Sequence, residues 1–316
     1  MTTWGIVATI KADTAPILRF VAYHLELGAQ RIYIYLDAPN PEAQEVLRNH
    51  PKCRVIRCDD GYWKRHNGSR PDMHQPRQTF NATRAYTKAH EVDWLMHMDV
   101  DEFLVSEGQV ASHLGALPET IKCARARPME LLAGGDPQKD AAFKTFIPAG
   151  RSREQIVSAL YPTFGEHLKG GFLSHIAGKV FVRTGIEGIK FRIHNAFLKG
   201  ETNPDHLEMP KVKLAHFHAT DWDTWHSHFA YRFREGSYRA DLGPARSRER
   251  GGITTHELFT LIQQEEDEAG LRQFFEEVCA DTPSLRDRLE TRGLLHQMTF
   301  QFDTDLAKHF PNFANI

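Results

Sequence analysis

The sequence predicts an α/β fold, with a mostly parallel sheet flanked by helices and a helical C-terminal extension. From residue 4 to about 105, short β-rich apolar runs alternate with segments of helical periodicity. Carboxylates follow the apolar run 94–98, where a central strand would end. Three helical segments occur between residues 255 and 290. We expect a principal domain over 1–235 and a loop and helical extension over 236–316.

The chain begins with the pattern of a βαβ unit. Trp4–Ile10 and Arg31–Leu36 are predicted strands, and 16–27 is the helix between them. The apolar residues of this helix fall largely on one side, and Gly28 ends it. Strands joined through a helix pair in parallel, so this order indicates a parallel sheet.

Further elements follow the same alternation. We predict a short helix over 42–48 and a strand over 54–57. A polar loop over 59–76 follows, then a longer helix over 78–90 and another strand over 94–98. Between residues 107 and 171 the pattern weakens, and only 122–127 is typical of a strand. Later strands are predicted over 179–182, 189–194 and 212–217, and helices over 222–238, 255–268, 270–279 and Pro283–Glu290.

Composition is that of an ordinary globular protein of 316 residues, 41% hydrophobic and 25% charged. The 39 lysines and arginines nearly balance 41 aspartates and glutamates, so no global field would attract nucleic acid or an anionic membrane. The four cysteines lack CxxC spacing, no signal peptide is visible, and no apolar run approaches the roughly 18 residues of a membrane span. These features favour the cytoplasm.

Two aspartates separated by one residue, Asp99 and Asp101, follow the apolar run. If the chain stays extended there, both carboxylates face one side and Val100 faces away. Such a pair suits a hard divalent cation, which oxygen ligands bind and which stabilises a departing diphosphate. The alternative is a solvated turn at the end of a strand.

Basic residues later in the chain are candidates for the same diphosphate. Lys179 and Arg183 are four apart on a predicted strand, so both would point to one face. Exposed cations are also commonly just solvated, which is the alternative for both. His194, at the end of the next predicted strand, is a further candidate.

Transfer of a group from a diphosphate to a hydroxyl also requires a general base that accepts the hydroxyl proton. The sequence pattern does not single out this base. Asp221 is preferred because it closely follows the segment 216–218, but it could equally be the N-cap of the helix that begins near Trp222. The other candidates are Glu130, Asp136 and Asp223.

Over residues 4 to about 235 the chain resembles glycosyltransferases with the GT-A fold, family-2-like and similar to the family-92 type. The matching residues are Tyr23-His24 and Leu27-Gly28, Asp37 at the end of a strand, Gln78 with Asn81, the block from Trp94 to Leu104, Gly178-Lys179 to Arg183, and His216-Phe217-His218. The chain departs from the family at Lys11-Ala12-Asp13, where Lys-Asn-Glu is frequent.

The resemblance implies that Thr9, Lys11 and Asp37 line a nucleotide pocket, that Asp101 binds manganese or magnesium, and that His216 approaches the same cation. An imidazole ligand would favour manganese. For His216 the alternative is a histidine satisfied by hydrogen bonds. Taken with the patterns above, the predicted donor-binding residues also include Gln78, Asp99, Lys179 and Arg183, the metal ligands include Asp99, and the catalytic residues are Asp101 and Asp221.

The expected activity is metal-dependent transfer of a sugar from a nucleotide-sugar, UDP-linked, to a glycan or lipid-linked acceptor with inversion. The expected setting is the cytoplasm, with peripheral association at the inner face of the membrane as a variant and no nucleic-acid partner. Two alternatives stay open. His97, Asp99 and His216 could form the two-histidine-one-carboxylate iron site of an oxygenase, or the chain could be an inactive sugar-binding domain.

Overall fold

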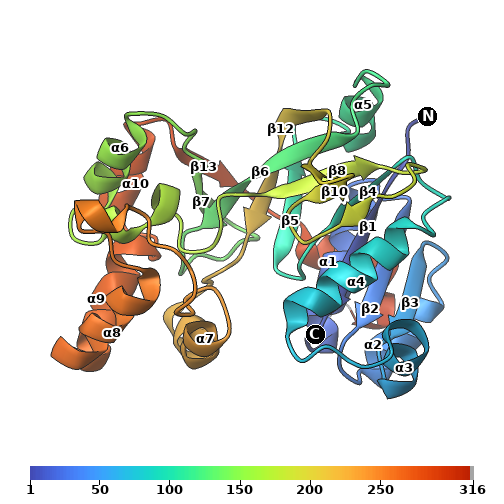
Figure 1. The fold of residues 1–316 in the computed structure, drawn as a ribbon, viewed down its shortest axis with the longest axis horizontal. Helices are drawn as coiled ribbons and strands as arrows, with labels where there is room; N and C mark the ends of the chain where they lie inside the picture. Colours follow the sequence, from blue (N-terminus) through green and yellow to red (C-terminus); the bar gives the residue numbers. More distant parts are fainter. Residues whose placement is uncertain (314–316) are drawn as a thin grey trace. The chain divides into compact units, whose positions relative to one another are not determined.

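In the computed structural model, which describes residues 1–313, four parallel strands form one end of a sheet in the order β4-β1-β2-β3, with β3 at the edge (Figure 1). These strands are β1 (Trp4–Ile10), β2 (Arg31–Leu36), β3 (Cys53–Arg57) and β4 (Trp94–His97). Helices connect them, as parallel pairing requires. The predicted mostly parallel α/β sheet is confirmed.

Antiparallel strands extend the sheet beyond β4. Strand β8 (Lys179–Arg183) pairs with β4, and the first half of β6 (Cys123–Leu131) pairs with β8. Strand β5 (Glu102–Ser106) pairs with β12 (His206–His216). A separate three-stranded sheet holds β9 (Lys190–Phe191), β10 (Ala196–Leu198) and β11 (Glu201–Thr202). The strand predicted over 189–194 was too long, because the chain bends directly after β9.

The chain divides into two compact units, and each unit is built from separate segments. The first contains Met1–Arg127, Ala177–Leu214 and the chain from Gln301 onward, and the second contains Pro128–Ile176 and Ala215–Phe300. This division differs from the linear one predicted at residue 235. Contacts between segments far apart in sequence cause the difference, since the C-terminal helix packs on the first helix of the chain.

The helices of the first unit cover its sheet. They are α1 (Thr14–Glu26), α2 (Pro41–Arg48), α3 (Asp60–Asn67), α4 (His74–Tyr86), α5 (Val110–Gly115), α11 (Phe302–His309) and the 3₁₀ turn η4 (Pro311–Phe313). Helix α4 packs on β1, where it lies over the blue strands in Figure 1. The loop predicted over 59–76 is wrong, because α3 and the start of α4 lie within it. Asp59 caps α3 by accepting a hydrogen bond from the Tyr62 amide at 2.8 Å.

Two neighbouring residues of α1 fix the strand that follows the acidic motif. The Tyr23 hydroxyl donates to the Leu104 carbonyl at 2.7 Å, and the Leu104 amide donates to His24 Nε2 at 3.2 Å. Burial lowers the pKa of His24 to about 3, so the imidazole is neutral and can accept this bond. The Tyr-His pair therefore anchors β5.

The second unit has its own core and contains further strands of the ten-stranded sheet. Strand β7 (Ala141–Thr145) pairs with the second half of β6 and with β13 (Leu295–Met298), antiparallel in both cases. The aromatic residues Trp225, Phe259 and Phe274 lie at the centre of its core. Its helices are α6 (Arg153–Leu160), α7 (Trp222–Arg234), α8 (Thr255–Glu265), α9 (Asp267–Val278) and α10 (Pro283–Glu290), with 3₁₀ turns η1 (Gly165–His167), η2 (Lys169–Gly171) and η3 (Arg248–Arg250).

The helices α8, α9 and α10 match the three helices predicted near the C-terminus. The helix predicted over 222–238 ends earlier, at Arg234. Among residues 1–313, no helix combines the length and the apolar character that a membrane crossing requires.

Candidate functional site

Three adjacent parallel strands of the first unit end in polar residues. Strand β1 ends just before Lys11, β2 just before Asp37, and β4 two residues before Asp99. Because β4, β1 and β2 are neighbours in the sheet, these side chains share its carboxyl edge. Ligands of open α/β sheets bind at this edge. The predicted location of the site is therefore present in the fold.

The acidic motif forms a turn between β4 and β5. Val100 and Asp101 occupy the turn, and the Glu102 amide donates to the Asp99 carbonyl at 3.1 Å. The Asp99 amide in turn donates to the Glu102 carboxylate at 2.8 Å. The condition of an extended chain is therefore not met here, because the Glu102 side chain closes a turn. Asp101 is half-buried at the tip of this turn.

One buried ammonium joins two carboxylates at this turn. Lys179 Nζ lies 2.7 Å from Asp99 Oδ2 and 3.2 Å from Glu102 Oε2. Lys179 and Glu102 are both 0% exposed, whereas the Asp99 side chain is 29% exposed. Burial alone would raise the pKa of Asp99, but the Lys179 ammonium holds it well below its usual range. Asp99 is therefore ionised and fixed in place.

Backbone geometry delivers Lys179 to this position. Gly178 has a φ of +67°, and a Cβ added there would lie 2.1 Å from the Ala126 carbonyl oxygen of β6. Only glycine fits this close approach. The Gly-Lys pair of the sequence is thus explained by packing against β6 and by the ion pair that follows.

Helix α4 presents amides to the same edge of the sheet. Gln78 Nε2 donates to Asp99 Oδ1 at 2.5 Å, and Asn81 Nδ2 donates to the Thr9 hydroxyl at 3.1 Å. The Tyr62 hydroxyl donates to Asn81 Oδ1 at 2.6 Å and orients that amide. The two amides are three residues apart, so they lie on one face of the helix. The structure thus brings Gln78, Thr9 and Asp99 together.

Asp37 lies among cations that the sequence analysis did not identify. Its carboxylate is 3.1 Å from Arg70 Nη2 and 3.0 Å from Arg77 Nε, and Lys11 adds a further positive charge nearby. Burial raises the pKa of Asp37, and the two guanidinium groups oppose that shift. Arg70 and Arg77 fall in the stretch 59–76 and at the start of α4, where no motif marked them. Only their long-range pairing with Asp37 reveals them.

Arg183 is not part of this cluster. It lies opposite Trp94 at the far end of β8, stacks 4.3 Å from that indole ring, and donates to the Ile121 and Pro118 carbonyls at 3.0 and 3.2 Å. Four residues of strand separate it from Lys179 by roughly 13 Å. The two basic residues share a strand face, but the structure does not bring both to Asp99.

Two histidines accompany Asp99 in the first unit. Burial and the charge of Lys179 lower the pKa of His97 to about 4, so this ring is neutral inside the sheet. His194 Nδ1 lies 3.1 Å from the Gly178 carbonyl, and its charge contributes to the low pKa of Asp99. The candidate His194 thus lies near the predicted carboxylate.

The second unit gathers three histidines around the end of β12. The ring centroid of His216 lies 5.3 Å from that of His175 and 5.3 Å from that of His218. His216 and His175 can present ligand nitrogens within 4.8 Å of each other. His218 instead hydrogen-bonds the Tyr238 hydroxyl at 2.9 Å, and burial lowers its pKa well below the usual value. Sequence reasoning missed His175, which stands in no recognisable motif.

Asp221 is the N-cap of α7. Its Oδ1 accepts from the Thr224 amide at 2.7 Å, and its Oδ2 accepts from the Thr224 and Thr220 hydroxyls at 2.7 and 2.9 Å. Burial would raise the pKa of Asp221, but these bonds lower it overall. The geometry therefore agrees with the capping alternative, and an acid with a lowered pKa is a poor proton acceptor.

The other candidates for a general base in the second unit differ in burial. Glu130 is buried and lies 2.8 Å from Lys144 Nζ, an ion pair that holds the pKa of Glu130 low despite burial. Asp136 is exposed beside Lys139 at 3.3 Å. Asp223 lies in the first turn of α7. None of these surroundings singles out a base.

Comparison with known families identifies the chain. The model of the family described as "Glycosyltransferase family 92" matches residues 7–234, which is more than half of the chain. Comparison with proteins of curated function finds no match.

Several solved structures are similar to the chain at low identity. HddC from Yersinia pseudotuberculosis is 12% identical with a TM-score of 0.34, and the match covers 68% of this chain and 93% of that one. GalNAc-T7, solved with UDP, GalNAc and Mn²⁺, is 13% identical with a TM-score of 0.38, covering 99% and 58%. The glycosyltransferase GlyE of Streptococcus pneumoniae TIGR4 is 18% identical with a TM-score of 0.25, covering 40% and 30%.

The family match decides between the classes of protein that the sequence left open. The oxygenase alternative is wrong, because the matched family is one of glycosyltransferases and His97 is a buried, neutral ring at the end of β4. The expected resemblance to the family-92 type is confirmed over nearly the same residues that suggested it. The chain belongs to glycosyltransferase family 92 and is a glycosyltransferase.

Proposed function

We propose that this enzyme transfers a sugar from a UDP-sugar to a glycan or lipid-linked acceptor, with a divalent cation and with inversion. The observation that carries the proposal is the arrangement at the carboxyl edge of β4, β1 and β2. There Asp99 is held by the buried Lys179, Asp37 is held by the half-buried Arg77 and the exposed Arg70, and Asp101 lies in the same turn as Asp99. A nucleoside diphosphate needs both kinds of group: carboxylates that hold a divalent cation or a ribose hydroxyl, and cationic side chains that hold phosphate oxygens.

Asp101 is the proposed carboxylate ligand of the cation. Asp99 already accepts bonds from Lys179 and Gln78, so its role is to contact the donor or a cation-bound water from a fixed position. Asp101 is half-buried in the same turn, two residues further along the chain. When bound, the cation would supply charge that stabilises the departing diphosphate. Carboxylate oxygen suits both manganese and magnesium.

The nucleotide would lie over β1 and β2. Asp37 keeps spare acceptor capacity, since a carboxylate offers about four lone-pair sites and its two arginines use only part of them. It can therefore accept from a ribose hydroxyl. Lys11, Arg70 and Arg77 place positive charge beside it, where phosphate oxygens would lie.

The second unit offers imidazole ligands. His216 and the neighbouring His175 would bind a transition-metal cation through their ring nitrogens, and such ligands suit manganese better than magnesium. Imidazole binds metals in its neutral form, and a bound metal displaces protons from it. We propose this pair as the metal-binding donors of the second unit.

We also propose that the enzyme acts in the cytoplasm or at the inner face of its membrane. All four cysteines are buried free thiols, which agrees with a reducing compartment. The acceptor would be a glycan or a lipid-linked glycan.

The proposal is tested by screening nucleotide-sugars for thermal stabilisation, with manganese and with a chelator. A ligand that binds only the native state raises the melting temperature, so the proposal expects one UDP-sugar to do so in the presence of manganese. That donor is then incubated with candidate acceptors, and the anomeric configuration of the product is followed by NMR. Stabilisation by another nucleotide class, or equal stabilisation without the cation, would contradict the proposed donor chemistry.

A further inference from the structure

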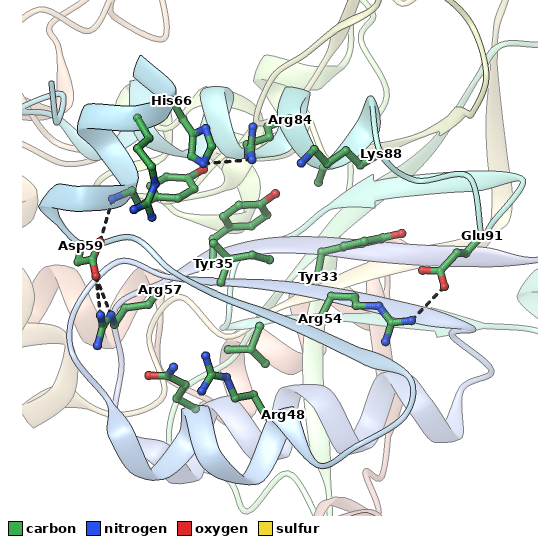
Figure 2. Close-up of a pocket in the computed structure, with 16 residues that line it drawn as sticks. Tyr33, Tyr35, Arg48, Arg54, Arg57, Asp59, His66, Arg84, Lys88 and Glu91 are labelled. Atoms are coloured by element: carbon green, nitrogen blue, oxygen red, sulfur yellow. Dashed lines mark hydrogen bonds and ion pairs between the residues drawn. The ribbon is translucent and has the colours of Figure 1, made fainter. Parts of the chain in front are cut away.

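A cavity of the first unit lies beside the edge strand β3, as Figure 2 shows. Its volume is about 750 Å³. The walls come from β2, β3, α2, α3 and α4, and within residues 1–313 no strand pairs with the edge of β3 opposite β2. None of the residues assigned above to the donor lines this cavity. It is therefore separate from the site at the carboxyl edge.

Positive charge is concentrated in this cavity. Two carboxylates line it, Asp59 and Glu91, and both are already paired: Asp59 lies 2.7 Å from Arg57, and Glu91 lies 3.0 Å from Arg54. Six cationic side chains line the same walls, namely Arg48, Arg54, Arg57, Arg65, Arg84 and Lys88. The whole chain has a formal charge of −2, so this excess is local.

Four of these cations have no carboxylate partner within ion-pair distance among residues 1–313: Arg48, Arg65, Arg84 and Lys88. Arg84 instead donates to His66 Nε2 at 3.2 Å and lies 5.9 Å from the centre of the Tyr62 ring. These contacts hold its guanidinium group without neutralising it. The four cations line one cavity, Arg84 and Lys88 on one side of the strands and Arg48 on the other (Figure 2), and a bound anion would offset their positive charge.

The cavity also has an aromatic floor. Tyr33 and Tyr35 of β2 are 6% and 2% exposed, and both lie between α4 and β3 in Figure 2. Alternate residues of a strand point to the same face, which places the two rings side by side beneath Arg84 and Lys88 (Figure 2). Rigid rings give the cavity a fixed base, so an anion entering it meets a preformed site rather than a mobile surface.

We propose that this cavity is a second anion site, which binds a phosphate-bearing ligand through Arg48, Arg65, Arg84 and Lys88. A carboxylate would bring one charge and two oxygens, too few for four unpaired cations. A phosphate or diphosphate brings more charge and more acceptors, and guanidinium groups match its oxygens in pairs. The phosphate could be free, as in a soluble metabolite or activated sugar, or could belong to a lipid headgroup.

The experiment titrates inorganic pyrophosphate into the full-length protein by calorimetry, with a chelator present so that cation-dependent donor binding is absent. The test variant is Arg48→Gln with Lys88→Gln. The control variant is Lys64→Gln with Arg292→Gln, which removes the same charge types from exposed positions outside the cavity. We expect the test variant to bind at least about tenfold more weakly than wild type, and the control to stay within about twofold.

Melting temperatures of both variants show whether they are folded, and rising salt should weaken the wild-type affinity. Unchanged binding in the test variant would overturn the proposal, because the anion would then be held elsewhere. Absence of pyrophosphate binding by wild type, together with absence of vesicle binding, would also overturn it.

Sedimentation with vesicles distinguishes the two sources of phosphate. Vesicles of phosphatidylcholine alone are compared with vesicles that also contain phosphatidylglycerol. Binding to the anionic vesicles that the test variant loses and the control keeps supports a lipid headgroup. Pyrophosphate binding with no vesicle binding supports a soluble ligand. Equal vesicle binding by the test and control variants contradicts the lipid source.

Discussion

The Lys179 ammonium lies between Asp99 and Glu102, 2.7 Å from one carboxylate and 3.2 Å from the other. A fully buried cation thus fixes both ends of the turn that contains Asp101. The consequence is that the acidic motif is rigid before any ligand arrives. This matters for transfer chemistry, because pre-positioned charges need no reorganisation during the reaction.

Replacing Lys179 should therefore destabilise the protein strongly. Lys179→Met leaves the buried Glu102 and the partly buried Asp99 without their cation, and breaking a buried ion pair typically costs about 3–5 kcal/mol. Urea unfolding measures the change in the free energy of unfolding. The double variant Lys179→Met/Glu102→Gln should lose less than the sum of the two single variants, because it also removes one unpaired charge. A loss below about 1 kcal/mol in Lys179→Met would contradict this account.

Asp37→Asn should weaken donor binding. The carboxylate would no longer accept charge-assisted bonds from a ribose hydroxyl, which corresponds to roughly a tenfold rise in KM for the donor, with kcat little changed. Steady-state kinetics with the UDP-sugar found in the screen provides the measurement. Asp287→Asn, an exposed change on α10, is the matched control. An unchanged KM for the donor in Asp37→Asn would show that Asp37 does not contact the nucleotide.

The buried pair Glu130–Lys144 should be critical for the second unit. Glu130 also accepts from the Leu173 and Ser174 amides at 3.1 and 2.8 Å, so Glu130→Gln breaks an ion pair and disturbs two hydrogen bonds. We expect a loss of about 3–5 kcal/mol in stability. Removing both charges in Glu130→Gln/Lys144→Met should cost less than Glu130→Gln alone. Equal stability of Glu130→Gln and wild type in thermal unfolding is the contrary outcome.

The free energy of unfolding should decrease as the pH is lowered from about 6.5 to about 3, in part because of His24. The unfolded imidazole takes up a proton below its ordinary pKa of 6.5, whereas the folded one does so only below about 3. In this window the unfolded state binds one more proton, so stability decreases as pH falls, by about 1.4 kcal/mol per pH unit. Unfolding titrations should show a shallower slope for His24→Gln. The exposed His228→Gln should keep the wild-type slope, and identical slopes for all three proteins would refute the assignment to His24.

The parallel core was predictable because its signals are local. The pattern of apolar residues predicts strand β1 and helix α1. Gly28 follows the helix with a φ of +105°, which agrees with its predicted role in ending it. The same pattern predicts carboxylates at the ends of the strands. It does not predict the turn at Asp99, since no sequence signal shows that the Glu102 side chain folds back to accept a hydrogen bond from the Asp99 amide.

Residues that meet only through the fold could not be predicted. Arg70 and Arg77 reach Asp37 from more than thirty positions away, and His175 comes beside His216 from another segment of the second unit. Helix α11, which returns to α1, divides the chain differently from any linear boundary. Long-range pairs of this kind leave no periodic trace in a single sequence.

The most direct test of the account measures UDP binding by calorimetry as a function of manganese, in wild type and in Asp101→Asn. Wild type should bind UDP at least about tenfold more tightly with manganese than with a chelator, since a cation held by carboxylate oxygen would offset the charge of the diphosphate. Asp101→Asn should lose that enhancement while Asp287→Asn keeps it. If Asp101→Asn retains the full manganese effect, the turn between β4 and β5 does not hold the cation and the proposed mechanism is wrong.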